Sequence, residues 1–248
     1  MKPTCLIIAH RGDSGSEPEN TLKAFESAYH KGADGIELDC HLTRDKKVVV
    51  SHDRNLKRIT GENRDCCASL YRDLIGLDFG KKEKIPLLVE VFDLFLKKFA
   101  VINIEIKSTG VFTNGIEKHI AMLIKQYRCA SQIIVSSFNP AHLLRFKRLM
   151  PQVRLGYLIC EKQDWIARNR YAVRIVGPST LNLQKELVTL TSFNGLLGLA
   201  IPQWIWTVNK KHEMEFWLDR GAQAIITNEP GLLKSVMAGS KKDSACQT

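Results

Sequence analysis

The chain alternates short apolar runs with segments of helical periodicity along nearly all of its 248 residues. The predicted strands span residues 5–10, 35–42, 48–52, 101–107, 133–138, 154–159, 173–178, 203–208 and 224–227. The predicted helices span residues 20–31, 88–98, 116–127, 140–150, 163–171, 184–191, 211–220 and 230–237. This βαβα order indicates a parallel sheet with helical crossovers. About eight such units favour an α/β fold of the (β/α)8 TIM-barrel type, with the open doubly wound sheet as the alternative.

Two segments depart from this rhythm. Residues 53–86 carry many charges and little periodicity, and they end at Pro86. We therefore expect a small insertion after the second barrel strand, within one domain that spans residues 1–238. The last residues, 239–248, read "GSKKDSACQT" and are predicted to form a disordered tail, because they contain too little apolar surface to pack.

The net charge of +10 is compatible with an anionic partner such as nucleic acid, an acidic membrane surface or a phosphorylated small molecule, but a basic, solvated surface is the favoured interpretation. Aromatic residues make up only 8% of the chain and no long Lys/Arg run occurs, so a nucleic-acid partner is not expected. The sequence has seven cysteines, an odd number, and no two of them form a C-x-x-C motif. This pattern predicts free thiols in a reducing compartment and no zinc site. No apolar run reaches 18 residues, so we expect a cytoplasmic protein without a transmembrane segment. The oligomeric state stays open.

Two predicted strands alternate polar and apolar side chains, whereas a barrel strand should be apolar on both faces. In "GIELDCHL", Glu37 and Asp39 share one face, because strand side chains alternate with a period of two. In "VINIEIK", Glu105 and Lys107 share one face in the same way. We expect the apolar faces to contact the surrounding helices and the polar faces to point into the barrel.

The carboxylates of Glu37, Asp39 and Glu105 predict a divalent-cation site. Burying them unpaired would be costly, so a positive group must lie beside them. Ligands that are all oxygen favour Mg²⁺, Mn²⁺ or Ca²⁺ over zinc. Two other interpretations remain: an edge strand that faces solvent, or a simple salt bridge from Lys107.

Two histidines end predicted strands beside these carboxylates. His10 closes the first strand, and His52 follows the strand in "VVVSHD". A single histidine in such a place is usually structural, but two of them are typical of an acid/base pair. Arg11 can hold a phosphate through its guanidinium fork. His41 shares the ligand face and is ambiguous. The remaining histidines lie in helical patterns and are expected at the surface: His30, His119, His142 and His212.

Trp206 lies about two-thirds of the way along the predicted strand 203–208. Active sites of (β/α)8 barrels lie at the C-terminal ends of the strands, where a tryptophan would form the wall of a pocket. A tryptophan of the hydrophobic core is the equally plausible interpretation.

Taken together, "AHRG", "PENT", "GADGIELDCHLTRD", "VVVSHD", "INIEIK" and "WTVN" resemble the glycerophosphodiester phosphodiesterase family, in particular its compact bacterial-type members. The resemblance runs from about residue 7 to residue 230. It implies a TIM barrel with an insertion after the second barrel strand, which agrees with residues 53–86. It also implies metal-dependent hydrolysis of a glycerophosphodiester to glycerol 3-phosphate and an alcohol. The nucleophile would be the substrate's own glycerol hydroxyl, and water would then open the cyclic phosphate.

The resemblance also implies a role for each candidate residue. The implied catalytic residues are His10 and His52, the metal ligands are Glu37, Asp39 and Glu105, and the substrate-binding residues are Arg11, Lys107 and Trp206. The cofactor would be Mg²⁺, Ca²⁺ or Mn²⁺, and the partner a small phosphodiester. Which histidine gives a proton and which takes one stays open.

Two departures from the family pattern leave alternatives open. Asn228 in "IITNEP" stands where an acidic residue is common, and "TSFNGLLGLAIPQWIW" is apolar where the family usually has a histidine. A lysophospholipase D would apply the same chemistry to an acyl-bearing substrate. A barrel that only binds phosphorylated metabolites or lipid headgroups is the non-enzymatic alternative, but binding a phosphate needs no acid/base pair.

Overall fold

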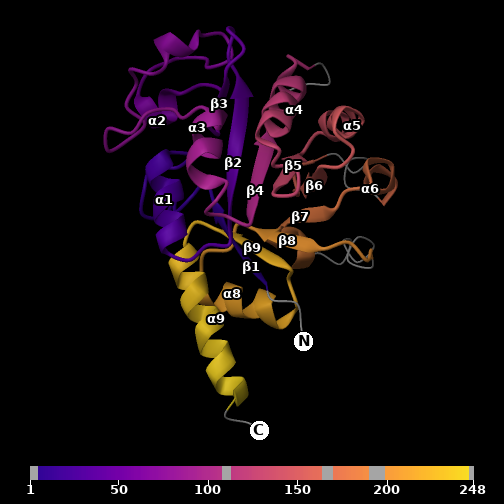
Figure 1. The fold of residues 1–248 in the computed structure, drawn as a ribbon. Helices are drawn as coiled ribbons and strands as arrows, with labels where there is room; N and C mark the ends of the chain where they lie inside the picture. The colour runs from indigo at the N-terminus through magenta and orange to yellow at the C-terminus, as the bar shows by residue number, and fades with distance from the viewer. Residues whose placement is uncertain (1–4, 108–112, 164–169, 190–198, 246–248) are drawn as a thin grey trace.

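Eight parallel strands form a closed barrel in a computed structural model that describes residues 5–107, 113–163, 170–189 and 199–245. The strands are β1 (Leu6–His10), β2 (Gly35–Leu42), β4 (Val101–Ile106), β5 (Ile133–Ser137), β6 (Arg154–Ile159), β7 (Thr180–Gln184), β8 (Gln203–Trp206) and β9 (Ala224–Thr227). Neighbouring strands pair in this order, and β1 pairs with both β2 and β9, which closes the ring (Figure 1). The prediction of a (β/α)8 barrel is confirmed, and the open sheet is excluded.

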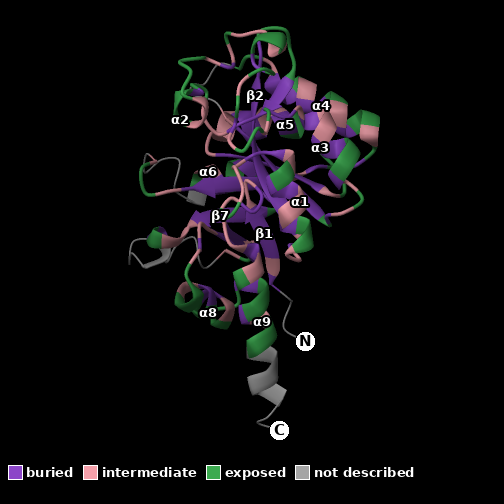
Figure 2. Ribbon diagram, turned by 90° about the vertical axis from the view of Figure 1, so that its left-hand side faces the viewer, coloured by how far each residue is buried: buried purple, intermediate pink, exposed green. Residues whose placement is uncertain are grey.

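Helices follow the strands and cover the outside of the barrel (Figure 1). They are α1 (Leu22–His30), α3 (Leu88–Phe95), α4 (Ile116–Tyr127), α5 (Pro140–Leu149), α6 (Arg170–Val176), α8 (Lys211–Asp219) and α9 (Pro230–Ala245), with the 3-10 helix η2 (Lys185–Thr189) after β7. Figure 2 shows the buried strands inside and the exposed helix surfaces outside. Ile36 and Leu38 of β2 pack in one core with Phe25 of α1 and Val91 of α3. The apolar face of β2 therefore contacts helices, as predicted.

The strand predicted at residues 173–178 is wrong. This segment belongs to α6, in which Val173 and Val176 are buried and Ile175 is exposed. That three-residue spacing is helical, although β-branched residues favour strands. The helix ends at Gly177, whose φ of 58° is left-handed, and the strand β7 starts only at Thr180. The predicted helix at 184–191 is represented by η2.

The insertion begins after β3 (Val48–Val50), an extra strand that pairs antiparallel with β2. It contains the short helices α2 (Lys57–Thr60) and η1 (Tyr71–Asp73). Its side chains form a small core with Val49 of β3, and the members of this core from the insertion are Leu56, Cys66, Leu74, Phe79 and Ile85. The insertion lies at the opposite end of the molecule from α9 (Figures 1 and 2).

The C-terminal helix α9 continues past residue 237, where the sequence predicts its end. It runs to Ala245, so most of the tail that was expected to be disordered is helical in this structure. Residues 246–248 lie outside the described residues. Within the described chain, no helix combines the length and the hydrophobicity that a membrane span requires.

Candidate active site

The sequence-predicted site residues converge at the C-terminal ends of the barrel strands. A pocket of about 80 Å³ lies there, and its lining comprises His10, Arg11, Glu37, His52, Glu105, Lys107, Phe138, Leu158, Trp206 and Ile226. Asp39 is the one predicted residue that does not line the pocket. It is fully buried and contacts the lining through Arg11 and Lys107.

Pairing of β2 with β4 brings the three carboxylates together. Asp39 is the register partner of Glu105, and Glu37 lies two residues before Asp39 on the same face. Carboxylate oxygens of Glu37, Asp39 and Glu105 lie within 4.8 Å of one another. All three residues are buried, with 4%, 1% and 7% of their surface exposed. The edge-strand interpretation is therefore excluded, because an exposed edge would leave these side chains in water.

Two basic side chains partly neutralise this cluster. Lys107 Nζ lies 2.9 Å from Glu105 Oε1 and 3.3 Å from Asp39 Oδ1, and Arg11 Nε lies 3.3 Å from Asp39 Oδ2. Burial alone would raise the pKa of Asp39, but Lys107 and Arg11 hold that pKa well below its usual range.

The two basic side chains, Lys107 and Arg11, cannot compensate all three carboxylates of the cluster. Burial, and then the negative charges of Asp39 and Glu105, raise the pKa of Glu37 well above its usual value. Burial also raises the pKa of Glu105 to about 7, although Lys107 opposes the shift. Lys107 and Arg11 thus compensate Asp39 but leave Glu37 and Glu105 without a full counter-charge. A donor set of buried oxygens with excess negative charge fits a hard divalent cation.

The two histidines have matching geometry. His10 Nδ1 lies 2.7 Å from the side-chain oxygen of Asn228, and His52 Nδ1 lies 2.7 Å from Asp53 Oδ1. Since these oxygens accept hydrogen bonds, each Nδ1 carries a proton, and Nε2 has a free lone pair whenever the ring is neutral. His10 Nε2 is 4.0 Å from Glu37 Oε2, so it faces the carboxylate cluster.

Burial favours the neutral form of both imidazoles in the absence of substrate. Burial, with the charge of Arg11 as the second cause, lowers the pKa of His10 to about 4. Burial also lowers the pKa of His52, although the negative charge of Asp39 opposes the shift. A neutral imidazole with Nε2 unprotonated can accept a proton there.

The loop from β1 to α1 has an unusual backbone. Arg11 has a φ of 56° and Gly12 a φ of 81°, both in the left-handed region, so the chain turns directly after His10. The backbone N–H of Arg11 donates to the carbonyl of Glu37 at 2.9 Å and thereby attaches the loop to β2. This turn places the Arg11 guanidinium over Asp39.

Asn20 contributes to the site in a way that the sequence does not predict. The first helix is capped by Thr21, whose hydroxyl accepts from the N–H of Ala24. Asn20 is instead buried, and its Nδ2 donates to Asp39 Oδ2 at 2.9 Å. It therefore orients a predicted metal ligand.

His52 arrives by a different route from His10. It follows the extra strand β3, and the N–H of Ser51 donates to the carbonyl of Asp39 at 2.9 Å. The antiparallel return of β3, from Leu42 back along β2, thus brings His52 to the level of Asp39. Asp53 and Asn228 are partners of the two histidines that local sequence patterns did not predict. The position of Asp53 directly after His52 in "SHD" is a usable signal, whereas no local pattern reveals that Asn228 lies beside His10.

Trp206 forms part of the apolar wall of the pocket. Its Nε1 donates to the carbonyl of Asn182 at 2.9 Å, and its ring contacts Phe138 edge to face with centroids 5.6 Å apart. Leu158 and Ile226 complete this wall. Of the apolar segment 191–206 singled out in the sequence, residues 191–198 lie outside the described residues.

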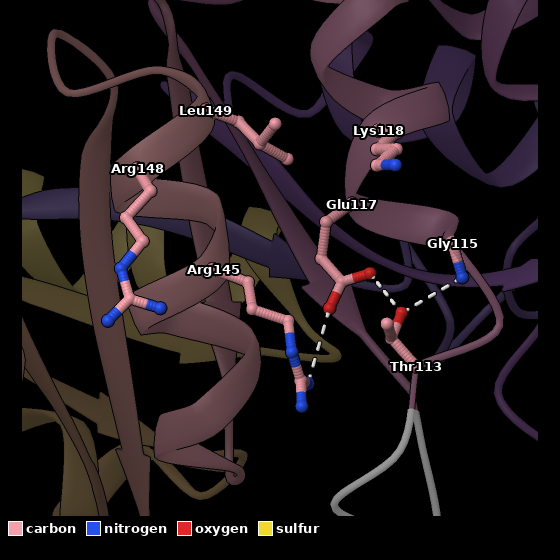
Figure 3. Close-up of a pocket in the computed structure, with 7 residues that line it drawn as sticks. All are labelled: Thr113, Gly115, Glu117, Lys118, Arg145, Arg148 and Leu149. Carbon is pink, nitrogen blue, oxygen red and sulfur yellow. Dashed lines mark hydrogen bonds and ion pairs between the residues drawn. The ribbon is translucent and has the colours of Figure 1, made fainter.

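A second pocket, of about 220 Å³, lies between α4 and α5 (Figure 3). Figure 3 shows Glu117 directed toward Thr113 and Arg145. The same carboxylate accepts from His142 Nδ1 at 2.6 Å, and both side chains are buried. The expectation that His142 lies at the surface is therefore wrong. These contacts of Glu117 join α4 to α5.

The fold and the pocket define the class of protein: a (β/α)8-barrel enzyme whose acidic, basic and histidine side chains meet at the C-terminal mouth. The model of the glycerophosphoryl diester phosphodiesterase family matches residues 10–232. The chain belongs to this family.

Individual relatives agree with this membership. The chain is 40% identical over 237 residues to a glycerophosphodiester phosphodiesterase of Caldanaerobacter subterraneus subsp. tengcongensis, which covers 92% of this chain and 96% of that protein. It is 32% identical over 276 residues to a lysophospholipase D of Homo sapiens, covering 93% and 85% of the two chains. A crystal structure of a glycerophosphodiester phosphodiesterase from Parabacteroides distasonis superimposes with a TM-score of 0.81 at 24% identity and covers 97% of this chain and all of the other.

Proposed function

We propose that this chain hydrolyses glycerophosphodiesters to glycerol 3-phosphate and an alcohol in the pocket between His10 and His52. The observation that carries the proposal is the convergence of two histidines, each anchored through Nδ1, with three buried carboxylates. Family membership and the 40% identical relative support the same chemistry.

In this proposal Glu37, Asp39 and Glu105 hold a divalent cation, Mg²⁺, Mn²⁺ or Ca²⁺. When bound, such an ion supplies positive charge that offsets the phosphoryl oxygens of the substrate. Arg11 and Lys107 line the same pocket and offset the charge that develops as the phosphodiester is attacked.

The two histidines divide the proton transfers. One accepts, at Nε2, the proton of the attacking glycerol hydroxyl as its oxygen forms a bond to phosphorus. The other histidine, as the imidazolium, donates its Nε2 proton to the alkoxide as the bond from phosphorus to the leaving alcohol breaks. Water then opens the cyclic phosphate with the two roles reversed. Asp53 and Asn228 accept from Nδ1 of the two rings and thereby leave each Nε2 for these transfers.

Lysophospholipase D activity is the second candidate. Phe138, Leu158 and Trp206 form an apolar wall in the pocket, which an acyl-bearing substrate would contact. The 32% identical human relative bears that activity in its name.

The test is an assay of the purified chain on glycerophosphocholine and on lysophosphatidylcholine, with and without EDTA. We expect turnover of glycerophosphocholine that EDTA abolishes and that Mg²⁺, Mn²⁺ or Ca²⁺ restores. Full activity in EDTA would contradict the cation site. Turnover of lysophosphatidylcholine alone would favour the second candidate, and turnover of neither substrate would contradict both enzymatic proposals.

A further inference from the structure

A second group of metal-ligating side chains lies outside the catalytic pocket. His41 is on β2, and Cys66 and Cys67 are adjacent in the insertion. His41 Nδ1 is 3.7 Å from Cys67 Sγ, and the two sulfurs are 4.0 Å apart. All three ligand atoms lie within 4.8 Å of one another.

These separations are close to those around a tetrahedral zinc ion. With Zn–S bonds of about 2.3 Å and Zn–N bonds of about 2.0 Å, two sulfurs lie about 3.8 Å apart and sulfur and nitrogen about 3.5 Å apart. The separations of Cys67 Sγ from Cys66 Sγ and from His41 Nδ1 match these values to within about 0.2 Å. Two thiolates and an imidazole are the soft and borderline donors that zinc prefers to Mg²⁺ or Ca²⁺.

The second nitrogen of His41 provides an independent indication. His41 Nε2 lies 3.2 Å from the backbone carbonyl of His52. Since a carbonyl only accepts, Nε2 carries the proton and the lone pair of Nδ1 is directed toward the thiols. Histidines that bind metals usually donate their other N–H to a backbone carbonyl or a carboxylate in this way.

The two thiols are held in place by their backbone. The N–H of Cys66 donates to the carbonyl of Arg54 at 2.9 Å, and the N–H of Cys67 donates to Asp65 Oδ1 at 2.8 Å. Asp65 is itself paired with Arg54, at 2.8 Å. Cys66 is fully buried, whereas Cys67 is partly exposed, so an ion and a water ligand can enter from the side of Cys67.

We propose that His41, Cys66 and Cys67 bind zinc, with water as the fourth ligand, and that this ion attaches the insertion to β2 behind His52. The sequence alone predicts no zinc site, because His41 is 25 residues from Cys66 and the cysteines form no C-x-x-C motif. Only the packing of the insertion against β2 brings the ligands together. The proposal does not depend on the substrate of the catalytic pocket.

Titration of the reduced, metal-free, full-length protein with Co²⁺ tests this site. Thiolate ligands produce a strong sulfur-to-cobalt charge-transfer absorption that carboxylates cannot produce, so the cluster around Glu37 does not interfere. We expect a band that saturates at one thiolate-bound Co²⁺ per chain and disappears when Zn²⁺ is added. Cys66→Ser and Cys67→Ser should each remove most of the band.

Two variants serve as controls. Cys160→Ser changes a half-buried thiol at the end of β6, and Glu105→Gln changes the carboxylate cluster; both should keep the band. Circular dichroism checks that each variant is folded, and partly exposed Cys67 gives the safer substitution. No band in the parent protein, an unchanged band in folded Cys67→Ser, or a Cys66–Cys67 disulfide in protein purified anaerobically would each overturn the proposal.

Discussion

At the scale of single residues, His10 and His52 donate to partners of different charge. His10 donates from Nδ1 to the neutral amide oxygen of Asn228, and His52 donates to the carboxylate of Asp53. A carboxylate stabilises an imidazolium more than an amide does. Asn228, which the sequence analysis noted as a departure from the family pattern, therefore influences the site by orienting His10 without adding a negative charge.

Replacing either histidine should remove most of the activity. We expect His10→Ala and His52→Ala to lower kcat on glycerophosphocholine by about 10²–10⁴-fold, the usual contribution of a general acid or base. A substrate with a p-nitrophenolate leaving group needs no acid, so it should restore turnover in only one of the two variants and thereby identify the acid. Rescue of both variants or of neither would show that the histidines do not divide the two roles.

Asp53 is expected to act as a positioning residue for His52. Asp53→Asn keeps a side chain of the same size but removes the charge opposite Nδ1, so we expect kcat to fall by about tenfold or more while KM changes little. Asp73→Asn is the matched control, because Asp73 also lies in the insertion and pairs with an arginine, Arg72. Equal kcat values for the two variants would remove Asp53 from the mechanism.

At the scale of secondary-structure elements, the loop between β1 and α1 determines where Arg11 lies. An added Cβ at Gly12 would lie 2.7 Å from the backbone carbon and the Cβ of Ala24. Gly12 also has a φ of 81°, a conformation that other residues adopt at a cost. The close approach of this loop to α1 thus requires glycine for two separate reasons.

Gly12→Ala should lower the free energy of unfolding by roughly 2–4 kcal/mol, from left-handed backbone strain and overpacking together. Gly61→Ala separates the two causes, since Gly61 has a similar φ of 78° but nothing within 4 Å of an added Cβ. We expect that control to lose only about 1 kcal/mol. Urea denaturation measures both values. Losses of equal size would mean that the contact with Ala24 contributes nothing.

The contact between α4 and α5 predicts a dependence of stability on pH. Burial raises the pKa of Glu117, but hydrogen bonds from His142 and Thr113 outweigh it and lower that pKa to about 2. A carboxyl whose pKa is lower in the folded state stabilises the fold above its ordinary pKa of about 4.5, and this stabilisation is lost as the pH falls toward 2. The Glu117→Gln variant should not show this loss of unfolding free energy at low pH.

The measurement is the free energy of unfolding between pH 5 and pH 2.5 for both proteins. The parent protein should lose more of it than Glu117→Gln over this interval, because only the parent has to protonate Glu117. Glu213→Gln is a suitable control, since Glu213 is an ion-paired carboxylate with less burial. Identical losses in parent and Glu117→Gln would contradict the assignment.

At the scale of the whole molecule, closure of the barrel joins the two ends of the chain. His10 and Asn228 are 218 positions apart in sequence, and they meet because β1 pairs with β9. The carboxylates of β2 and β4 meet in the same way, through strand pairing. The site is thus a consequence of the closed sheet.

The sequence by itself determined the order of the elements and the faces of the strands. Both follow from local periodicity: apolar runs alternate with helical patterns, and a period of two puts Glu37 and Asp39 on one side of β2. These local signals, together with the family resemblance, were sufficient to select site residues that lie in or beside one pocket, but periodicity alone left the open sheet as an alternative to the barrel. Periodicity misplaced the strand β7, because the β-branched residues of α6 directly before it have the composition of a strand.

Only the tertiary structure decided which distant residues become partners. The hydrogen bond of Asn228 to His10, the burial of His142 against Glu117, and the meeting of His41 with Cys66 and Cys67 all join separate elements. Periodicity and propensity describe a residue relative to its neighbours in the chain. Pairings of this kind depend instead on how the closed barrel brings distant strands, helices and the insertion into contact.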